Sequence, residues 1–133
     1  MAHTSYALRG MIFVFGSNTA GIHGAGAARY AYMERGAEWG IGIGRTGQCY
    51  AIPTKDRNLQ SLSLPEIHTY VDSFMKYARK NPTLEFQVTC IGCGLAGFRN
   101  DQIAPMFNTA PGNCWFDIKW ESFLPQARMW GMG

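Results

Sequence analysis

Two glycine-rich segments carry the residue types best suited to bind an anion. The first spans Ser17–Gly26 and ends in the triplet Gly24-Ala25-Gly26, and the second spans Gly92–Phe98. Glycine lets backbone N–H groups approach a phosphate without a Cβ in the way. Each segment directly follows an apolar run, so we expect both to lie at the carboxyl ends of strands, where α/β sheets bind their ligands. There they would hold two phosphates, or a phosphate and a ribose.

The segments around these loops predict the elements that position them. Apolar runs at 11–15 and 84–91 predict the two strands that lead into the loops. Residues Ala27–Arg35 predict a helix that begins directly after the first loop, with Gly36 as a C-terminal cap. The free N–H groups and the dipole at the start of such a helix favour phosphate.

The most clearly delimited helix begins at Ser63 and ends near residues 81–82. Ser63 and Glu66 have the spacing of a capping box, and Pro65 is tolerated in the first turn of a helix. Its expected apolar face consists of Leu64, Ile67, Val71, Phe74, Met75 and Ala78.

Three shorter elements complete the expected α/β pattern. We expect strands at 49–52, stopped by Pro53, and at 114–120, with a short helix at 100–108. Strands and helices therefore alternate, which predicts an α/β fold with a mostly parallel sheet and helices on both faces. The length of 133 residues suits one domain over residues 1–133. Residues 1–10 and 121–133 are expected at its periphery.

Composition and charge narrow the classes of partner. The chain has 12 Lys and Arg against 9 Asp and Glu, for a net charge of +3, and the basic residues form no block. This mild charge suits an anionic ligand and does not indicate nucleic acid. No apolar run approaches the roughly 20 residues of a membrane span. Residues 1–10 lack the pattern of a signal peptide, so we expect a soluble, cytoplasmic protein without a membrane partner.

Cys90 and Cys93 have the spacing of redox and zinc sites, but no second such pair or nearby histidine completes a zinc set. Cys90 also falls in a strand-like run, where cysteines usually pack as small apolar residues. We interpret both as structural thiols, and a redox pair or a metal site remain the alternatives. We expect neither a metal nor a cofactor.

Both glycine segments resemble the signature loops of macro domains, the ADP-ribose-binding family. Asn18–Gly26 is similar to the first loop, in which an asparagine follows the first core strand and a glycine-rich triplet opens a helix. Gly92–Phe98 resembles the second loop, which wraps a diphosphate and ends in an aromatic residue. The run Ile91–Leu95 is especially similar to the subgroup that removes ADP-ribose from protein carboxylates. Neither segment fits a dinucleotide fingerprint or a P-loop.

The resemblance implies a three-layer α/β/α fold with a mixed, mostly parallel sheet, and a role for each loop. Asn18 would hydrogen-bond the ribose nearest the scissile or free end, and the first triplet would offer N–H groups to that ribose and its phosphate. Cys93–Gly97 would cradle the diphosphate. Phe98 would pack on a ring of the ligand. Asn18 bracing its own turn and Phe98 packing in the core are the alternatives. The expected binding residues are Asn18, Gly24, Ala25, Gly26, Gly92, Cys93, Gly94, Leu95, Ala96, Gly97 and Phe98.

The sequence departs from macro domains where that family places carboxylates. Residues 1–17 contain no Asp or Glu to hold an adenine amino group. The two hydrolytic subgroups place an aspartate where this chain has Ala96 and Ala28. Without it no obvious base would activate water or a ribose hydroxyl.

Three functions follow as hypotheses. The first is a non-catalytic module that binds ADP-ribose, a related NAD-derived nucleotide or an ADP-ribosylated protein. The second is an ADP-ribosyl hydrolase or phosphatase with other catalytic groups, for which Lys55, Asp56 and His23 are the candidates. The third is a protein-interaction module, in which Phe123–Pro125 and Met129–Trp130 would suit a homodimer or partner contact.

Overall fold

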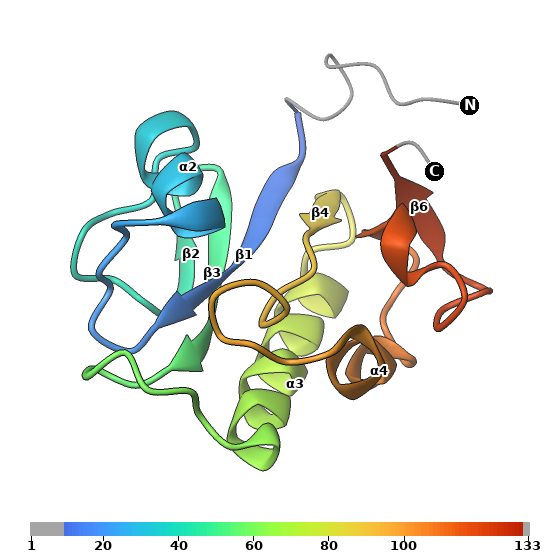
Figure 1. Ribbon diagram of the computed structural model, residues 1–133. Coiled ribbons are helices and arrows are strands. Elements are labelled where there is room, and N and C mark those ends of the chain that lie inside the picture. Colours follow the sequence, from blue (N-terminus) through green and yellow to red (C-terminus); the bar gives the residue numbers. More distant parts are fainter. Residues whose placement is uncertain (1–9, 132–133) are drawn as a thin grey trace.

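The computed structural model describes residues 10–131, in which the strands form one twisted sheet (Figure 1). The strand order is β2-β3-β1-β4-β5-β6, and every neighbouring pair is parallel except β2 with β3. The strands are β1 Ile12–Asn18, β2 Gly44–Thr46, β3 Cys49–Lys55, β4 Phe86–Val88, β5 Cys114–Asp117 and β6 Arg128–Trp130. The predicted α/β fold with a mixed, mostly parallel sheet is confirmed.

Helices cover both faces of this sheet. The helical segments are α2 Gly26–Glu34, α3 Leu64–Lys80, α4 Asn100–Ile103 and the 3-10 turns η1 Ala104–Phe107 and η2 Ile118–Trp120. Alternation along β1 separates two cores, because Phe13 and Phe15 pack with α2 while Ile12 and Val14 pack with α3. The architecture therefore has three layers.

The core on the α3 side is large and aromatic. Phe74 of α3 lies edge-on to Phe86 at 5.3 Å, and Phe107 lies edge-on to Phe116 at the same centroid distance. The helix begins where the capping box predicts, because the Glu66 N–H donates to Ser63 Oγ and the Ser63 N–H donates to Glu66 Oε1. Five of the six expected apolar-face positions are buried.

Several boundaries differ from the sequence-based expectation. β3 continues through Pro53 to Lys55, because β2 pairs with β3 only as far as Ala51 and a proline is tolerated where a strand has one neighbour. β4 is limited to Phe86–Val88 within the expected 84–91 run. The expected 114–120 strand divides into β5 and η2.

Residues 121–131 lie at the edge of the sheet and add a strand that the sequence did not predict. β6 extends the sheet beyond β5, Leu124 is buried, and the Trp130 indole N–H donates to the Val88 carbonyl at 2.9 Å. The expectation for the other terminus lies largely outside the described residues, as do residues 132 and 133.

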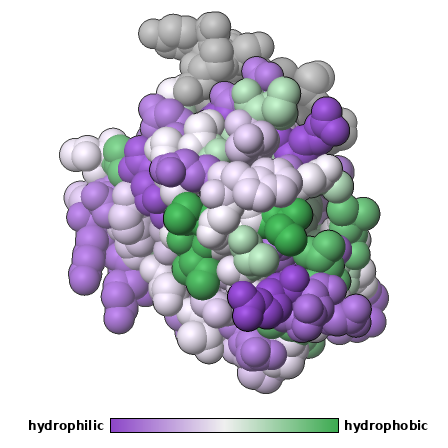
Figure 2. Space-filling view, turned by 90° about the vertical axis from the view of Figure 1, so that its left-hand side faces the viewer, coloured by the Kyte–Doolittle hydropathy of each residue, from purple (hydrophilic) through white to green (hydrophobic). Residues whose placement is uncertain are grey.

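The face formed by α2 and the segment after it exposes several apolar side chains, which appear as separate green groups in Figure 2. The exposed apolar side chains of the described residues include Met33 of α2 and, after it, Ile41 and Ile43, with Ile22 in the first loop. No helix in the described part of the chain is long and apolar enough to cross a bilayer.

Candidate functional site

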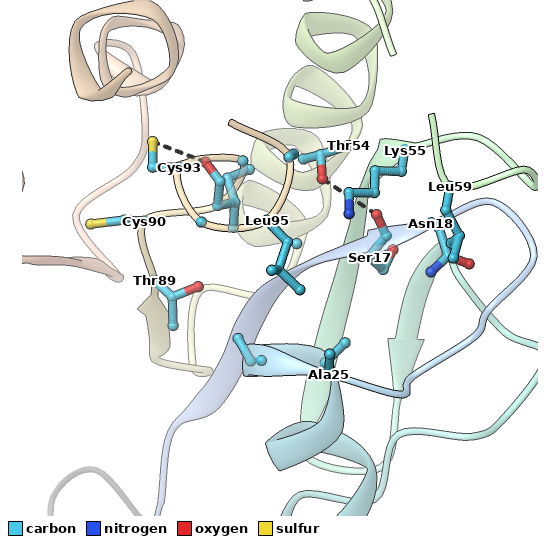
Figure 3. A pocket seen from close by; sticks show the side chains of 18 of the residues that line it. Ser17, Asn18, Ala25, Thr54, Lys55, Leu59, Thr89, Cys90, Cys93 and Leu95 are labelled. Carbon is cyan, nitrogen blue, oxygen red and sulfur yellow. Dashed lines mark hydrogen bonds between the residues drawn. The ribbon is translucent and has the colours of Figure 1, made fainter. Parts of the chain in front are cut away.

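A cavity of about 660 Å³ opens at the carboxyl ends of β1, β3, β4 and β5. Both glycine loops line it, and Figure 3 shows their side chains facing one another across it. The loops approach closely, since a Cβ built on Gly16 would lie 3.3 Å from the Gly92 nitrogen. A Cβ on Gly26 would lie 3.9 Å from Leu95 Cδ1. Parallel pairing of β1 with β4 therefore brings two loops far apart in sequence to one site.

The first loop delivers the N-terminus of α2 to the cavity. Ala25 is the N-cap and makes no side-chain capping hydrogen bond, and the first turn contains no acidic residue. The first N–H groups of a helix have no intrahelical partner, so here they remain available to an anion. Gly24 contributes open space, because a Cβ there would meet no atom within 4 Å.

Asn18 braces the first loop. Its Nδ2 donates to the Ile22 carbonyl at 2.8 Å, and its Oδ1 accepts from the Ile22 N–H at 2.9 Å. The side chain also lines the cavity. A carboxamide has a second N–H and a second lone pair, so the bracing role leaves Asn18 able to contact a ligand.

The second loop presents backbone N–H groups. The loop is closed by bonds from the Gly97 N–H to the Gly94 carbonyl at 3.0 Å and from Ser61 Oγ to the Ala96 carbonyl at 2.8 Å. The N–H groups of residues 94–96 have no acceptor among the described residues. Leu95 is 71% exposed and points between the loops (Figure 3). The second loop therefore leaves the backbone N–H groups of residues 94–96 without an acceptor beside the cavity.

Phe98 and Gly97, although expected in the binding set, are not among the residues that line the cavity. The Phe98 ring packs against the core, and a Cβ on Gly92 would lie 3.5 Å from its Cδ2. Its N–H donates to the Gly92 carbonyl at 2.9 Å. Phe98 thus packs between the second loop and the hydrophobic core, on the side away from the cavity.

Of the three candidate catalytic residues, only Lys55 lines the cavity. His23 is 1% exposed, and its Nε2 lies 2.9 Å from the Glu38 carbonyl oxygen, away from the cavity. Asp56 accepts the N–H groups of Asn58 and Gln60 and so stabilises the turn after β3. Lys55 lines the cavity.

A register shift positions Lys55. Along β1 and β3 the pairs run regularly to Ser17 with Pro53, and the next pair is Asn18 with Lys55, so Thr54 is an extra residue. Such a bulge bends a strand and re-aims the side chains that follow it. Figure 3 shows Lys55 and Asn18 at the same end of the cavity.

Sequence analysis missed several polar residues of the cavity. Thr54, Thr89, Cys90, Asp117 and Lys119 all line it. Each lies at or just after the carboxyl end of β3, β4 or β5, and that position was the available signal. Asp117 is the only carboxylate among the lining residues of the described chain.

The thiols of the cavity are held protonated. Burial, followed by the Asp117 carboxylate, raises the pKa of Cys90 to about 12, and burial raises the pKa of Cys93 to about 11. All four cysteines are free, and Cys93 Sγ donates to the Ile91 carbonyl. No group of three or more potential metal ligands occurs in residues 10–131.

We predict slow alkylation of Cys90 and Cys93 by iodoacetamide. At pH 8 a thiol with a pKa near 11 is about 0.1% thiolate and one with a pKa near 12 is about 0.01%, against roughly 10–20% for an ordinary cysteine. Reaction should therefore be about 100-fold slower than in the denatured chain for Cys93 and about 1,000-fold slower for Cys90. Mass spectrometry of each site measures the rates. Because these pKa values exceed the usual 9.0, the neutral thiols stabilise the fold below pH 9 and this contribution is lost as pH rises through 11–12. Alkylation of these cysteines in the folded chain as fast as in urea would contradict the predicted slow reaction.

Searches of protein-family models, curated proteins and solved structures found no match to this chain.

Proposed function

We propose that the chain binds ADP-ribose or a related NAD-derived nucleotide, as a non-catalytic module that recognises or sequesters it. The observation that carries the proposal is the convergence of two sets of unpaired N–H groups on one cavity. One set belongs to the first turn of α2 and the other to residues 94–96. Two adjacent N–H clusters suit two linked phosphates, which is the feature that distinguishes a diphosphate from a single phosphate.

The size and charge of the cavity support a dinucleotide-sized anion. Its volume of about 660 Å³ falls within the 300–1,000 Å³ range typical of small-molecule sites. Lys55 and Lys119 both line it, so a cation lies on β3 at one side and after β5 at the other. The likeness of both loops to macro-domain loops agrees with this ligand class.

Binding without turnover is favoured by the positions of Ala28 and Ala96. Both line the cavity, and neither can accept a proton. Asn18 and Lys55 lie together where the resemblance places the scissile ribose, and the one lining carboxylate, Asp117, belongs to a strand on the other side of β4. General acid–base help is worth about 10²–10⁴ in rate, so its absence there should leave hydrolysis slow.

We expect calorimetric titration to show micromolar binding of ADP-ribose and weaker binding of AMP and cyclic ADP-ribose. AMP has one phosphate for two N–H clusters, and losing a charge-assisted hydrogen bond costs roughly tenfold or more in affinity. The cyclic ligand tests whether the extended diphosphate geometry matters. Incubation with a carboxylate-linked ADP-ribosyl protein should release little ADP-ribose.

Two outcomes would change the assignment. Rapid release of ADP-ribose would overturn the binding-only function, and Lys55 would then be the first residue to replace. No binding of any of the three nucleotides at millimolar concentration would remove the nucleotide proposal, and a protein-interaction module would remain.

A further inference from the structure

The turn between β3 and α3 presents an exposed leucine to the cavity. Leu59 has a φ of 61° and is the only residue other than glycine with a left-handed φ in residues 10–131. Its side chain is 47% exposed and lines the cavity. A leucine rarely adopts this conformation, and such strain persists only where the surrounding structure fixes it, most often at sites that hold a ligand.

Hydrogen bonds at both ends fix this turn. The Leu59 N–H donates to the Asp56 carbonyl at 3.0 Å, and the Asp56 carboxylate accepts two further N–H groups of the turn. At the other end Ser61 forms an antiparallel bridge with Lys55 and donates its hydroxyl to the Ala96 carbonyl at 2.8 Å. Leu59 is therefore held by a turn that is anchored to β3 and to the second loop.

A second exposed apolar side chain, Ile22 of the first loop, lines the same end of the cavity. The Asn18 carboxamide bonds both the N–H and the carbonyl of Ile22. Leu59 belongs to the turn that follows Lys55, the strand partner of Asn18, and Figure 3 shows Leu59, Asn18 and Lys55 at one end of the cavity. Asn18 is buried, whereas Ile22 is 37% exposed. The two apolar side chains therefore lie nearer the solvent than the Asn18 carboxamide.

Lys55 supplies the charge at this end. Its ammonium forms no ion pair in the described structure, and the lining carboxylate, Asp117, is on β5, three strands away. A cationic ligand group would be repelled here, whereas a neutral group with a carbonyl oxygen can accept a hydrogen bond from the ammonium. A phosphate would match the charge but would lose water against Ile22 and Leu59, which is unfavourable.

We propose that the site binds most tightly a dinucleotide whose second ring is flat, neutral and bears a carbonyl group, as in a reduced nicotinamide dinucleotide. The ring is attached to the ribose beside Asn18, Ile22 and Leu59 cover its apolar faces, and Lys55 donates to its carbonyl oxygen. This inference rests on the proposed nucleotide-binding function. The free ribose end of ADP-ribose would leave both apolar side chains in water, and an oxidised pyridinium ring would bring a positive charge to Lys55.

The test compares NADH, NAD⁺ and ADP-ribose by calorimetry with the wild-type chain. NADH should bind about tenfold more tightly than ADP-ribose, because covering roughly 100 Å² of apolar surface outweighs the cost of ordering one ring. NAD⁺ should bind about 3- to 10-fold more weakly than NADH, owing to repulsion by Lys55. The fluorescence of the reduced ring measures independently whether the ring leaves water on binding.

Three variants assign these preferences to residues. Leu59→Ala removes the contact but keeps the strained backbone, so it should reduce the preference for NADH over ADP-ribose to within about twofold. Leu59→Gly should lose the preference as well and unfold at a higher temperature than Leu59→Ala, since glycine adopts a left-handed φ freely. Lys55→Gln should remove the difference between NADH and NAD⁺. Ile43→Ala is the matched control, since Ile43 is 48% exposed but does not line the cavity.

Equal affinity of the wild-type chain for NADH and ADP-ribose would overturn the inference and leave nucleotide binding intact. Binding of NAD⁺ at least as tight as that of NADH would do the same, as would an unchanged preference for NADH in a folded Leu59→Ala chain. If the variants fail to fold, the comparison of the three ligands on the wild-type chain decides. Absence of binding by all three ligands would remove both proposals.

Discussion

Gly94→Val is expected to abolish nucleotide binding while the domain stays folded. A Cβ on Gly94 would meet no protein atom within 4 Å, and its φ lies outside the left-handed region, so an added Cβ brings neither a clash nor left-handed backbone strain. Gly94 also lines the cavity. A branched side chain there would hold a phosphate away from the N–H groups of residues 94–96. Losing two charge-assisted hydrogen bonds corresponds to a drop in affinity of about 100-fold or more.

Gly112→Val is the matched control for this prediction. A Cβ on Gly112 also meets nothing within 4 Å and its φ is likewise unrestricted, but Gly112 does not line the cavity. Both variants should melt within a few degrees of the wild-type chain, and only Gly94→Val should lose heat of binding in calorimetry with ADP-ribose. Wild-type affinity in a folded Gly94→Val chain would show that this loop does not contact the ligand.

Gly42→Ala is expected to destabilise the whole domain. A Cβ on Gly42 would lie 1.8 Å from the Asn18 carbonyl oxygen and 3.0 Å from the Gly21 nitrogen, both of them backbone atoms that belong to the first loop. The Gly42 carbonyl also accepts the Ser17 hydroxyl. Overpacking costs about 1–3 kcal/mol and a lost hydrogen bond about 1 kcal/mol more, so we expect a loss of roughly 2–4 kcal/mol in the free energy of unfolding.

Thermal and urea unfolding measure this effect. For a domain of this size, 3 kcal/mol corresponds to a fall in Tm of roughly 10 °C. Gly112→Ala is the control, because the same added methyl group meets open space there. Unfolding of Gly42→Ala at the wild-type temperature and urea midpoint would mean that the Gly40–Gly44 segment moves away from the first loop at little cost.

The helices and strands that could be predicted are those determined by residues close together in the sequence. The start of α3 depends on two side chains three residues apart, and β1 begins with the continuous apolar run Ile12–Phe15. β2 and β6 escaped notice because each has three residues, too few to show a period of two. Their stability comes from pairing with β3 and β5, which local sequence does not specify.

In the site too, features set by local sequence could be predicted, whereas features set by strand pairing could not. The glycine loops were identifiable, because glycine after an apolar run has few other uses at a strand end. Asp117 could not be identified as a cavity residue from the sequence, since its position at the cavity depends on β5 lying next to β4. His23 was a catalytic candidate because it lies within the first loop, yet its side chain is buried outside the cavity and its Nε2 contacts the carbonyl oxygens of Glu38 and Ile41.

The two hydrophobic cores differ in size, and this difference affects which part of the domain unfolds locally. The α2 side is small and relies on Ala28 and Ala31 against Phe13 and Phe15, whereas the α3 side contains most of the large aromatic residues. Regions with little buried apolar contact open locally at a lower free energy than the global transition. Backbone amides of α2 should therefore exchange with deuterium sooner than those of α3. A nucleotide bound at the first turn of α2 would slow exchange of the α2 amides most. Deuterium exchange of this helix would therefore report how much of the protein has nucleotide bound.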